Sequence, residues 1–117
     1  MSAVTTEASR GLYYASAPQL KDDGQKTWIT RSANVVVVVS QVSAGTELAR
    51  SENPDEYMLL LPPGVRADIA AGGESLRADG ETLTILPPGQ SSIKVLDSGV
   101  VTRVFTVRAA DLAARAE

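Results

Sequence analysis

Short apolar segments separated by turn residues run along most of the chain. Residues 55–61 begin with two carboxylates, continue as an apolar run and stop at Pro62-Pro63-Gly64. Residues 81–86 repeat this arrangement and stop at Pro87-Pro88-Gly89. Proline cannot donate to a strand ladder and glycine permits a tight turn, so both segments are predicted to be strands that end in similar turns. The repeat indicates two similar units of one β architecture.

The strongest strand signal is the run of five valines at residues 35–39, which continues to residue 42. β-branched side chains favour extended backbone, and an unbroken apolar run of this length predicts a central strand covered on both faces. Further strands are predicted at residues 11–16, 27–30, 65–70, 74–79, 91–96 and 100–107, and a helix at residues 109–116. Polar and turn residues predict loops at residues 18–26 and 43–54.

Strands separated by turns about every 8–12 residues, followed by one helix, predict an all-β sandwich or barrel. The two similar units favour a jelly roll, which is two Greek keys closed into a barrel. A chain of 117 residues suits one domain. We expect a flexible N-terminal arm at residues 1–10 and a single barrel domain at residues 11–117.

The composition excludes several classes of protein. The chain contains no cysteine and no histidine, so disulfides, a thiolate nucleophile, a Ser-His-Asp triad and imidazole metal ligands are absent. The net charge is −3 and the basic residues are scattered, which argues against a nucleic-acid partner. No apolar stretch approaches the roughly 18 residues of a membrane-spanning helix. We therefore expect a cytoplasmic protein that binds neither nucleic acid nor membrane.

Residues 45–107 contain a spaced framework of glycine, proline and acidic positions. Its first part comprises Gly45, Arg50-Ser51-Glu52, Glu56 and Gly64. Its second part comprises Gly80, Pro87-Pro88-Gly89, Ser92 and Leu96, with Gly72-Gly73-Glu74-Ser75 between the two parts. This framework resembles the two motifs of the cupins and the hairpin between them. The resemblance implies an all-β, cupin-like jelly-roll β-barrel with a short C-terminal helix.

The metal-binding positions of the cupin motifs hold other residues in this chain. A typical cupin binds iron, manganese, zinc or nickel with two histidines and a glutamate from the first motif and a histidine from the second. The first two histidine positions fall on Arg50 and Glu52, or on Ser51 and Asn53 if the gap is placed differently. Ser92 stands at the last histidine position and Glu56 at the glutamate position. Such a set suits transition metals poorly, so we expect no metal and no cofactor.

The remaining candidates come from strand alternation and from the motif positions. If Glu56 points into the barrel, Met58 lies beside it, and a carboxylate at an apolar barrel mouth is suited to act as a general base. The alternative is that Glu56 forms an ion pair with Arg50 or Arg103. Lys94 is a second catalytic candidate if it is buried. The predicted ligand-binding residues are Arg50, Glu52, Met58, Ser92 and Arg103.

The sequence is compatible with two functions. The first is a metal-free small cupin that acts as a small-molecule-binding or accessory module. The second is a cofactor-independent isomerase, epimerase, cyclase or lyase with Glu56 as general base. The resemblance also implies a homodimer, because cupins commonly pair through their sheets. A small organic ligand is the expected partner in the barrel.

Overall fold

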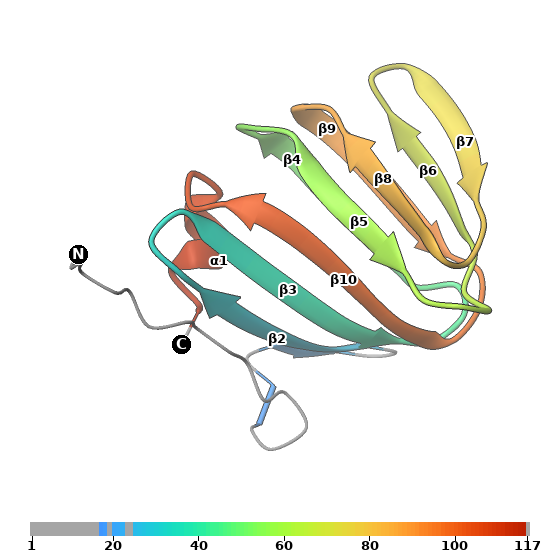
Figure 1. Ribbon diagram of the computed structural model, residues 1–117, viewed down its shortest axis with the longest axis horizontal. Coiled ribbons are helices and arrows are strands. Elements are labelled where there is room, and N and C mark those ends of the chain that lie inside the picture. Colours follow the sequence, from blue (N-terminus) through green and yellow to red (C-terminus); the bar gives the residue numbers. More distant parts are fainter. Residues whose placement is uncertain (1–16, 19, 23–24, 117) are drawn as a thin grey trace, which may run out of the picture.

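The computed structural model describes residues 17–18, 20–22 and 25–116. The elements in chain order are β1 (Leu20–Asp22), β2 (Gln25–Arg31), β3 (Val35–Val42), β4 (Glu47–Asn53), β5 (Tyr57–Leu61), β6 (Ala67–Ala71), β7 (Glu74–Ala78), β8 (Thr82–Leu86), β9 (Gly89–Val95), β10 (Gly99–Thr106) and α1 (Ala110–Ala113). The strands form a six-stranded sheet in the order β1-β2-β3-β10-β5-β8 and a four-stranded sheet in the order β4-β9-β6-β7. Figure 1 shows the last strand, β10, beside β3, with α1 near one end of the barrel. The predicted jelly-roll barrel is confirmed.

Most predicted strands are confirmed, with bounds that shift by a few residues. Two loop predictions are wrong, because residues 18–26 contain β1 and the start of β2, and residues 43–54 contain β4. The sequence of β4 lacks β-branched residues, but its backbone pairs with β9 from Glu47–Lys94 to Arg50–Ser91. Pairing with a strong neighbour therefore overrides the weak local propensity of β4. The arm predicted at residues 1–10 and the strand at residues 11–16 lie outside the described residues.

The inner faces of both sheets form one hydrophobic core. Its members alternate along the strands, so every second residue points inward. The largest fully buried apolar side chains are Tyr57, Phe105, Ile29, Leu59, Leu86, Ile93, Val36, Val38, Val95 and Val101.

The valine strand β3 is covered on one face only within the described part of the chain. Val36, Val38 and Val42 are buried, whereas Val37 and Val39 are half-buried and Val35 is exposed. The predicted cover on both faces is therefore wrong for the single chain. The outward valines lie on the outer surface of the six-stranded sheet.

The first Pro-Pro-Gly turn packs against the turn that follows β7. A Cβ atom on Gly80 would lie 2.7 Å from the backbone nitrogen of Gly64 and 2.9 Å from the carbonyl oxygen of Pro62. Such contacts leave no room for a side chain, so position 80 requires glycine. The sequence predicts both turns separately, and the fold brings them into contact.

Candidate functional site

An aromatic pair occupies the interior where the neighbouring strands β5 and β10 face β9 of the other sheet. The rings of Tyr57 and Phe105 stack with centroids 4.5 Å apart and an interplanar angle of 19°. The Tyr57 hydroxyl forms a buried hydrogen bond with Ser91 Oγ, with 2.6 Å between the two oxygens. Tyr57, Ser91 and Phe105 are all inward positions of their strands. The interior therefore contains hydroxyl groups beside an apolar aromatic surface.

Arg103 brings a positive charge into this interior. Its exposed fraction is 7%, and its guanidinium carbon lies 5.5 Å from the centre of the Phe105 ring. Arg103 Nε has no hydrogen-bond acceptor among the described residues, and no ion pair between them includes this side chain. Burial lowers the pKa of Arg103 to about 10, because removal from water disfavours the charged form. A buried cation without a carboxylate is costly for the folded state.

A second guanidinium, that of Arg50 on β4, lies over the same aromatic pair. Its central carbon is 5.2 Å from the centre of the Phe105 ring, and its Nε donates to Asn53 Oδ1 at 2.9 Å. Its Nη1 and Nη2 donate to the two carboxylate oxygens of Asp111 at 2.7 and 2.9 Å. Asp111 belongs to α1, which the buried Leu112 fixes to the barrel. The charge of Arg50 is thus paired, whereas that of Arg103 is not.

The pKa values of Tyr57 and Asp111, two ionisable groups of the cluster, are shifted in opposite directions. Burial raises the pKa of Tyr57 above its usual value, although the hydrogen bond with Ser91 and the nearby guanidinium groups oppose this shift. The Tyr57 hydroxyl therefore stays protonated at neutral pH and can donate a hydrogen bond to a bound oxygen. The hydrogen bonds from Arg50 hold the pKa of Asp111 below its usual range. Asp111 is therefore a carboxylate at neutral pH.

The structure brings two of the predicted site residues, Arg50 and Arg103, into one inner cluster. It places the other candidates elsewhere: Glu52, Glu56 and Lys94 are exposed, and Met58 and Ser92 are half-buried at outward positions of their strands. The inward orientation considered for Glu56 and Met58 is wrong, because β5 points Tyr57 inward instead. The alternative ion pair of Glu56 with an arginine is also wrong, since Arg50 pairs with Asp111 and Arg103 with no described carboxylate.

In the second motif too, the inward residue lies one position from the predicted one. Ser92 donates to Glu47 Oε2 at 2.6 Å on the outer surface, while the neighbouring Ser91 points inward to Tyr57. Lys94 also faces outward, opposite Glu47 in the strand pairing. The motif spacing therefore did not indicate Tyr57, Ser91 or Phe105 as site residues. If the inward positions are counted from one residue later in β5 and from one residue earlier in β9, strand alternation selects Tyr57 and Ser91.

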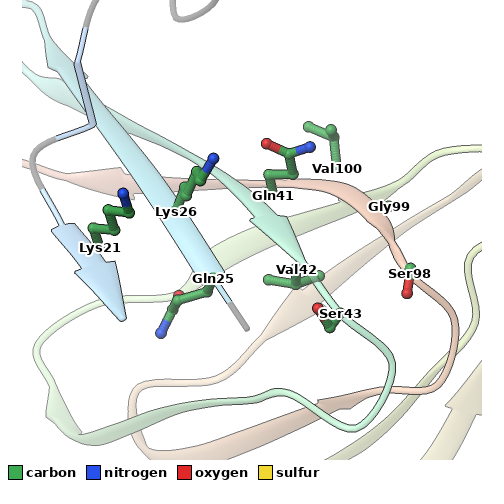
Figure 2. A pocket seen from close by; sticks show the side chains of 9 residues that line it. All are labelled: Lys21, Gln25, Lys26, Gln41, Val42, Ser43, Ser98, Gly99 and Val100. Carbon is green, nitrogen blue, oxygen red and sulfur yellow. The ribbon is translucent and has the colours of Figure 1, made fainter. Parts of the chain in front are cut away.

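A separate hollow of about 530 Å³ lies at the end of β2, β3 and β10. Figure 2 shows its lining residues, which are Lys21, Gln25, Lys26, Gln41, Val42, Ser43, Ser98, Gly99 and Val100. None of them belongs to the cluster around Arg103. The hollow and the inner cluster are therefore distinct features.

No protein-family model and no curated protein sequence matches the chain. Among solved structures, KdgF from Halomonas sp. superposes with a TM-score of 0.71 at 13% identity, covering 86% of this chain and 94% of that one. An RmlC-like cupin from Shewanella frigidimarina superposes with a TM-score of 0.70 at 11% identity, covering 86% and 91%. The fold is that of the cupins. Salicylate 1,2-dioxygenase from Pseudoaminobacter salicylatoxidans, in an adduct with gentisate, is also similar (TM-score 0.64, 14% identity, 83% of this chain and 28% of that one).

The inner residues of this barrel do not fit the metal of a typical cupin. Inward positions near the expected ligand positions hold Arg50, Asn53, Tyr57 and Ser91. Within the described ranges, no three His, Cys, Asp or Glu side chains lie close enough together to hold an ion. Two guanidinium groups beside the aromatic pair repel a cation and attract an anion. No described helix is long and apolar enough to cross a membrane.

Proposed function

We propose that this cupin-fold protein is a binding module that holds a small organic carboxylate beside Arg103. The observation that carries the proposal is the buried guanidinium of Arg103, whose Nε has no acceptor and which has no carboxylate partner in the described part of the chain. A planar guanidinium matches a carboxylate with two parallel hydrogen bonds. Binding a carboxylate would therefore satisfy both the charge and the free donor.

The surroundings of Arg103 favour an aromatic carboxylate. Phe105 and Tyr57 form a buried stacked pair beside Arg103, and a ligand ring that enters the barrel there would gain favourable offset stacking with this pair. The Tyr57–Ser91 hydroxyl pair provides a neutral donor beside the charge. The similar dioxygenase is named for salicylate and was solved with gentisate, and both compounds are aromatic carboxylates. Shared fold alone does not transfer a ligand, so salicylate serves here as a probe.

The Arg50–Asp111 ion pair is the proposed competitor of the ligand. Asp111 already supplies a carboxylate to Arg50, with hydrogen bonds of 2.7 and 2.9 Å. A ligand that reaches Arg103 beside Phe105 can also interact with Arg50 if Asp111 releases it. The variant Asp111→Asn removes the competing charge, so we expect it to bind the anion more tightly than the unchanged protein.

The test is a calorimetric titration of the full chain with salicylate, with salicylamide as the neutral analogue. We expect salicylate to bind and salicylamide to bind at least about tenfold more weakly, since the amide cannot neutralise Arg103. Arg103→Met should lose salicylate binding. Arg77→Met, which changes an exposed arginine on the outside of the other sheet, should bind as the unchanged protein does.

The unfolding free energy of Arg103→Met distinguishes loss of binding from loss of the fold. Removing a buried and unpaired charge should leave the protein at least as stable and make it up to about 4 kcal/mol more stable. Loss of binding in a more stable protein then reports the role of Arg103 in binding. Equal binding of salicylate and salicylamide, unchanged binding by Arg103→Met, or no binding of salicylate at millimolar concentration would each contradict the proposal.

The cofactor-independent enzyme with Glu56 as general base receives less support. Glu56 is exposed, and no aspartate or glutamate is among the buried residues of the described chain. Proton transfer from carbon needs a base within hydrogen-bond reach of the substrate. The inner cluster supplies donors instead, which suits binding of an anion.

A further inference from the structure

Two of the three lysines of the chain stand opposite each other at the hollow beside β1, β2, β3 and β10. Strand pairing places Lys21 of β1 directly opposite Lys26 of β2, and both side chains are exposed. The pairing continues from Lys26, an outward position of β2, to Gln41 of β3 and then to Val100 of β10. These four residues form one row across the sheet, and all of them line the hollow of about 530 Å³. Figure 2 shows both lysine side chains on the same side of the strands.

The two lysines bring like charges together without a counter-charge in the described part of the chain. Directly opposite residues of an antiparallel pair have Cβ atoms about 4.5–5.5 Å apart, and like charges at such positions destabilise the pairing. No ion pair between described residues includes Lys21 or Lys26. None of the nine described residues that line the hollow is an aspartate or a glutamate. The hollow is therefore positively charged in a chain whose net charge is −3.

The neutral polar groups of the hollow have hydrogen atoms left to donate. Ser98 Oγ accepts from the backbone nitrogen of Ala44 at 3.0 Å, so the hydroxyl hydrogen of Ser98 can be donated to a ligand. Gln25 Oε1 accepts from Thr27 Oγ1 at 3.2 Å, which leaves the two amide hydrogens of Gln25. The lining thus adds neutral donors to the two ammonium groups, and this combination is suited to the oxygen atoms of an anion.

We propose that this hollow binds a phosphate monoester of a small hydroxylated molecule, with the phosphate group between Lys21 and Lys26. Such a phosphate carries a charge of about −1.5 to −2 at neutral pH and three acceptor oxygens, so one group neutralises both lysines, whereas a carboxylate neutralises only one. The volume of about 530 Å³ lies within the range of about 300–1,000 Å³ that small-molecule sites occupy. Gln25 and Ser98 are suited to the hydroxyl groups of the ester, and Val100 is suited to its carbon atoms.

The proposed phosphate site is separate from the cluster around Arg103. Lys26 and Gln41 are at outward positions of their strands, whereas Arg103 points into the barrel from β10. The two proposals are therefore independent, and each has its own variant. Arg103→Met should bind a phosphate ester as the unchanged protein does, and Lys26→Gln should bind salicylate as the unchanged protein does.

The test is a calorimetric titration of the full chain with glucose 6-phosphate, with glucose as the neutral analogue and inorganic phosphate as the bare anion. We expect a dissociation constant below about 1 mM for glucose 6-phosphate. Glucose and inorganic phosphate should each bind at least about tenfold more weakly, because each lacks one half of the contacts. The single tryptophan of the chain, Trp28, lies two residues from Lys26 on β2 and so on the same face of the sheet. Its fluorescence should change with the same dissociation constant.

Lysine variants locate the binding. Lys21→Gln and Lys26→Gln each remove one charge and should weaken the binding of glucose 6-phosphate at least about tenfold. Lys26→Arg keeps the charge and should retain most of the binding. The matched control is Lys94→Gln, which changes the net charge by the same amount at the third lysine, exposed on β9 and opposite Glu47. It should bind as the unchanged protein does. Circular dichroism of every variant confirms that the strands are retained.

Three results would overturn the proposal. The first is no heat of binding with glucose 6-phosphate at about 10 mM. The second is equal binding by Lys26→Gln and Lys94→Gln, which would mean that the anion responds to the net charge of the protein and not to the hollow. The third is inorganic phosphate that binds as tightly as the ester, which would mean that the hollow does not contact the organic part of the ligand.

Discussion

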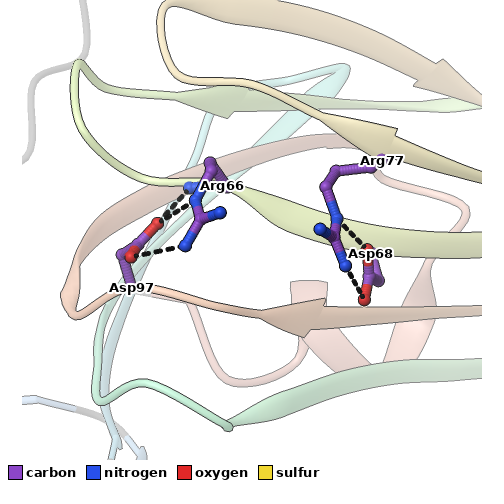
Figure 3. A network of polar contacts seen from close by, with 4 residues as sticks. All are labelled: Arg66, Asp68, Arg77 and Asp97. Carbon is purple, nitrogen blue, oxygen red and sulfur yellow. Dashed lines mark hydrogen bonds and ion pairs between the residues drawn. The ribbon is translucent and has the colours of Figure 1, made fainter.

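The two sheets of the barrel present opposite chemistry to the outside. On the four-stranded sheet, Glu47, Lys94, Asp68 and Arg77 lie in one row across β4, β9, β6 and β7 and alternate in sign. Arg77 Nε donates to Asp68 Oδ1 at 2.8 Å, and in a second pair Arg66 Nε donates to Asp97 Oδ2 at 3.0 Å. Figure 3 shows the two pairs. On the six-stranded sheet, the corresponding rows are uncharged, and we call them the apolar face; they are Val39, Thr102, Leu60 and Leu83 in one row and Val37, Val104, Met58 and Ile85 in the next.

This difference lies in the surroundings that suit each outer surface. Both sheets are antiparallel and bury one side in the same core, so backbone geometry does not require the two outer sides to differ. A row of alternating charges is suited to water, where each side chain is solvated and its neighbours carry the opposite sign. A row of valine, methionine, leucine and isoleucine is suited to another apolar surface. The outward residues therefore separate a charged outer surface from an uncharged and largely apolar one on β3, β10, β5 and β8.

The largest expected effect separates the core from the apolar face within β5. Leu59→Ala should cost about 2–5 kcal/mol of unfolding free energy, because Leu59 is fully buried and the substitution leaves a cavity. Leu60→Ala should cost less than about 1 kcal/mol in dilute protein, since Leu60 is already 38% exposed. Urea unfolding of both variants measures the two costs. Equal costs would show that the outward position is packed within the single chain.

The second prediction concerns the dependence of stability on protein concentration. A dimer that forms through the apolar face should be about 2.7 kcal/mol more stable at a hundredfold excess over its dissociation constant than in dilute solution. Thermal unfolding at two concentrations measures this difference. Ile85→Lys, which adds a charge to the apolar face, should unfold at the same temperature at both concentrations, while Leu76→Lys on the four-stranded sheet should behave as the unchanged protein. A concentration-independent unfolding temperature for the unchanged protein would contradict an interface on either sheet.

The smallest expected effect lies on the outer surface of the four-stranded sheet. The hydrogen bonds from Arg77 lower the pKa of Asp68, so the native carboxylate releases its proton more readily than the unfolded one. The stabilisation is present above the unfolded pKa and is lost as the pH falls through the lower, folded pKa. Arg77→Ala should raise the pKa of Asp68 toward its usual value, as measured by NMR titration. High salt should weaken the charge effect by screening. An unchanged titration in Arg77→Ala would show that Arg77 does not set this pKa.

The fold was largely predictable because its signals are local. The valine run, the two Pro-Pro-Gly turns and the Gly72-Gly73 turn predict strands and reversals from neighbouring residues alone. β4 was not predictable in this way, because its ladder depends on β9, which lies about forty residues away. The contact between Gly80 and the first Pro-Pro-Gly turn also depends on tertiary structure.

The site was harder to predict because side chains alternate along a strand. An error of one residue in the assumed register therefore exchanges all the inward and outward positions. Assigning Glu56 instead of Tyr57, or Ser92 instead of Ser91, selects the outer surface in place of the interior. The cupin motif spacing carries an uncertainty of about that size. Arg103 was a candidate from sequence, but the alternation around it allowed either face. Packing of Val101 and Phe105 into the core resolves its direction.

The position of β10 has a consequence for synthesis of the chain. β10 lies between β3 and β5 in the six-stranded sheet, although it follows all the other described strands in the sequence. The valines of β3 pair with β10 from Val42–Gly99 to Val35–Thr106, so one edge of β3 stays unpaired until residues 99–106 have been synthesised. Pairings between such distant segments slow folding, and an open valine edge promotes aggregation meanwhile. Chains that terminate before residue 99 lack the strand that joins β3 to β5, and these fragments should accumulate as insoluble material.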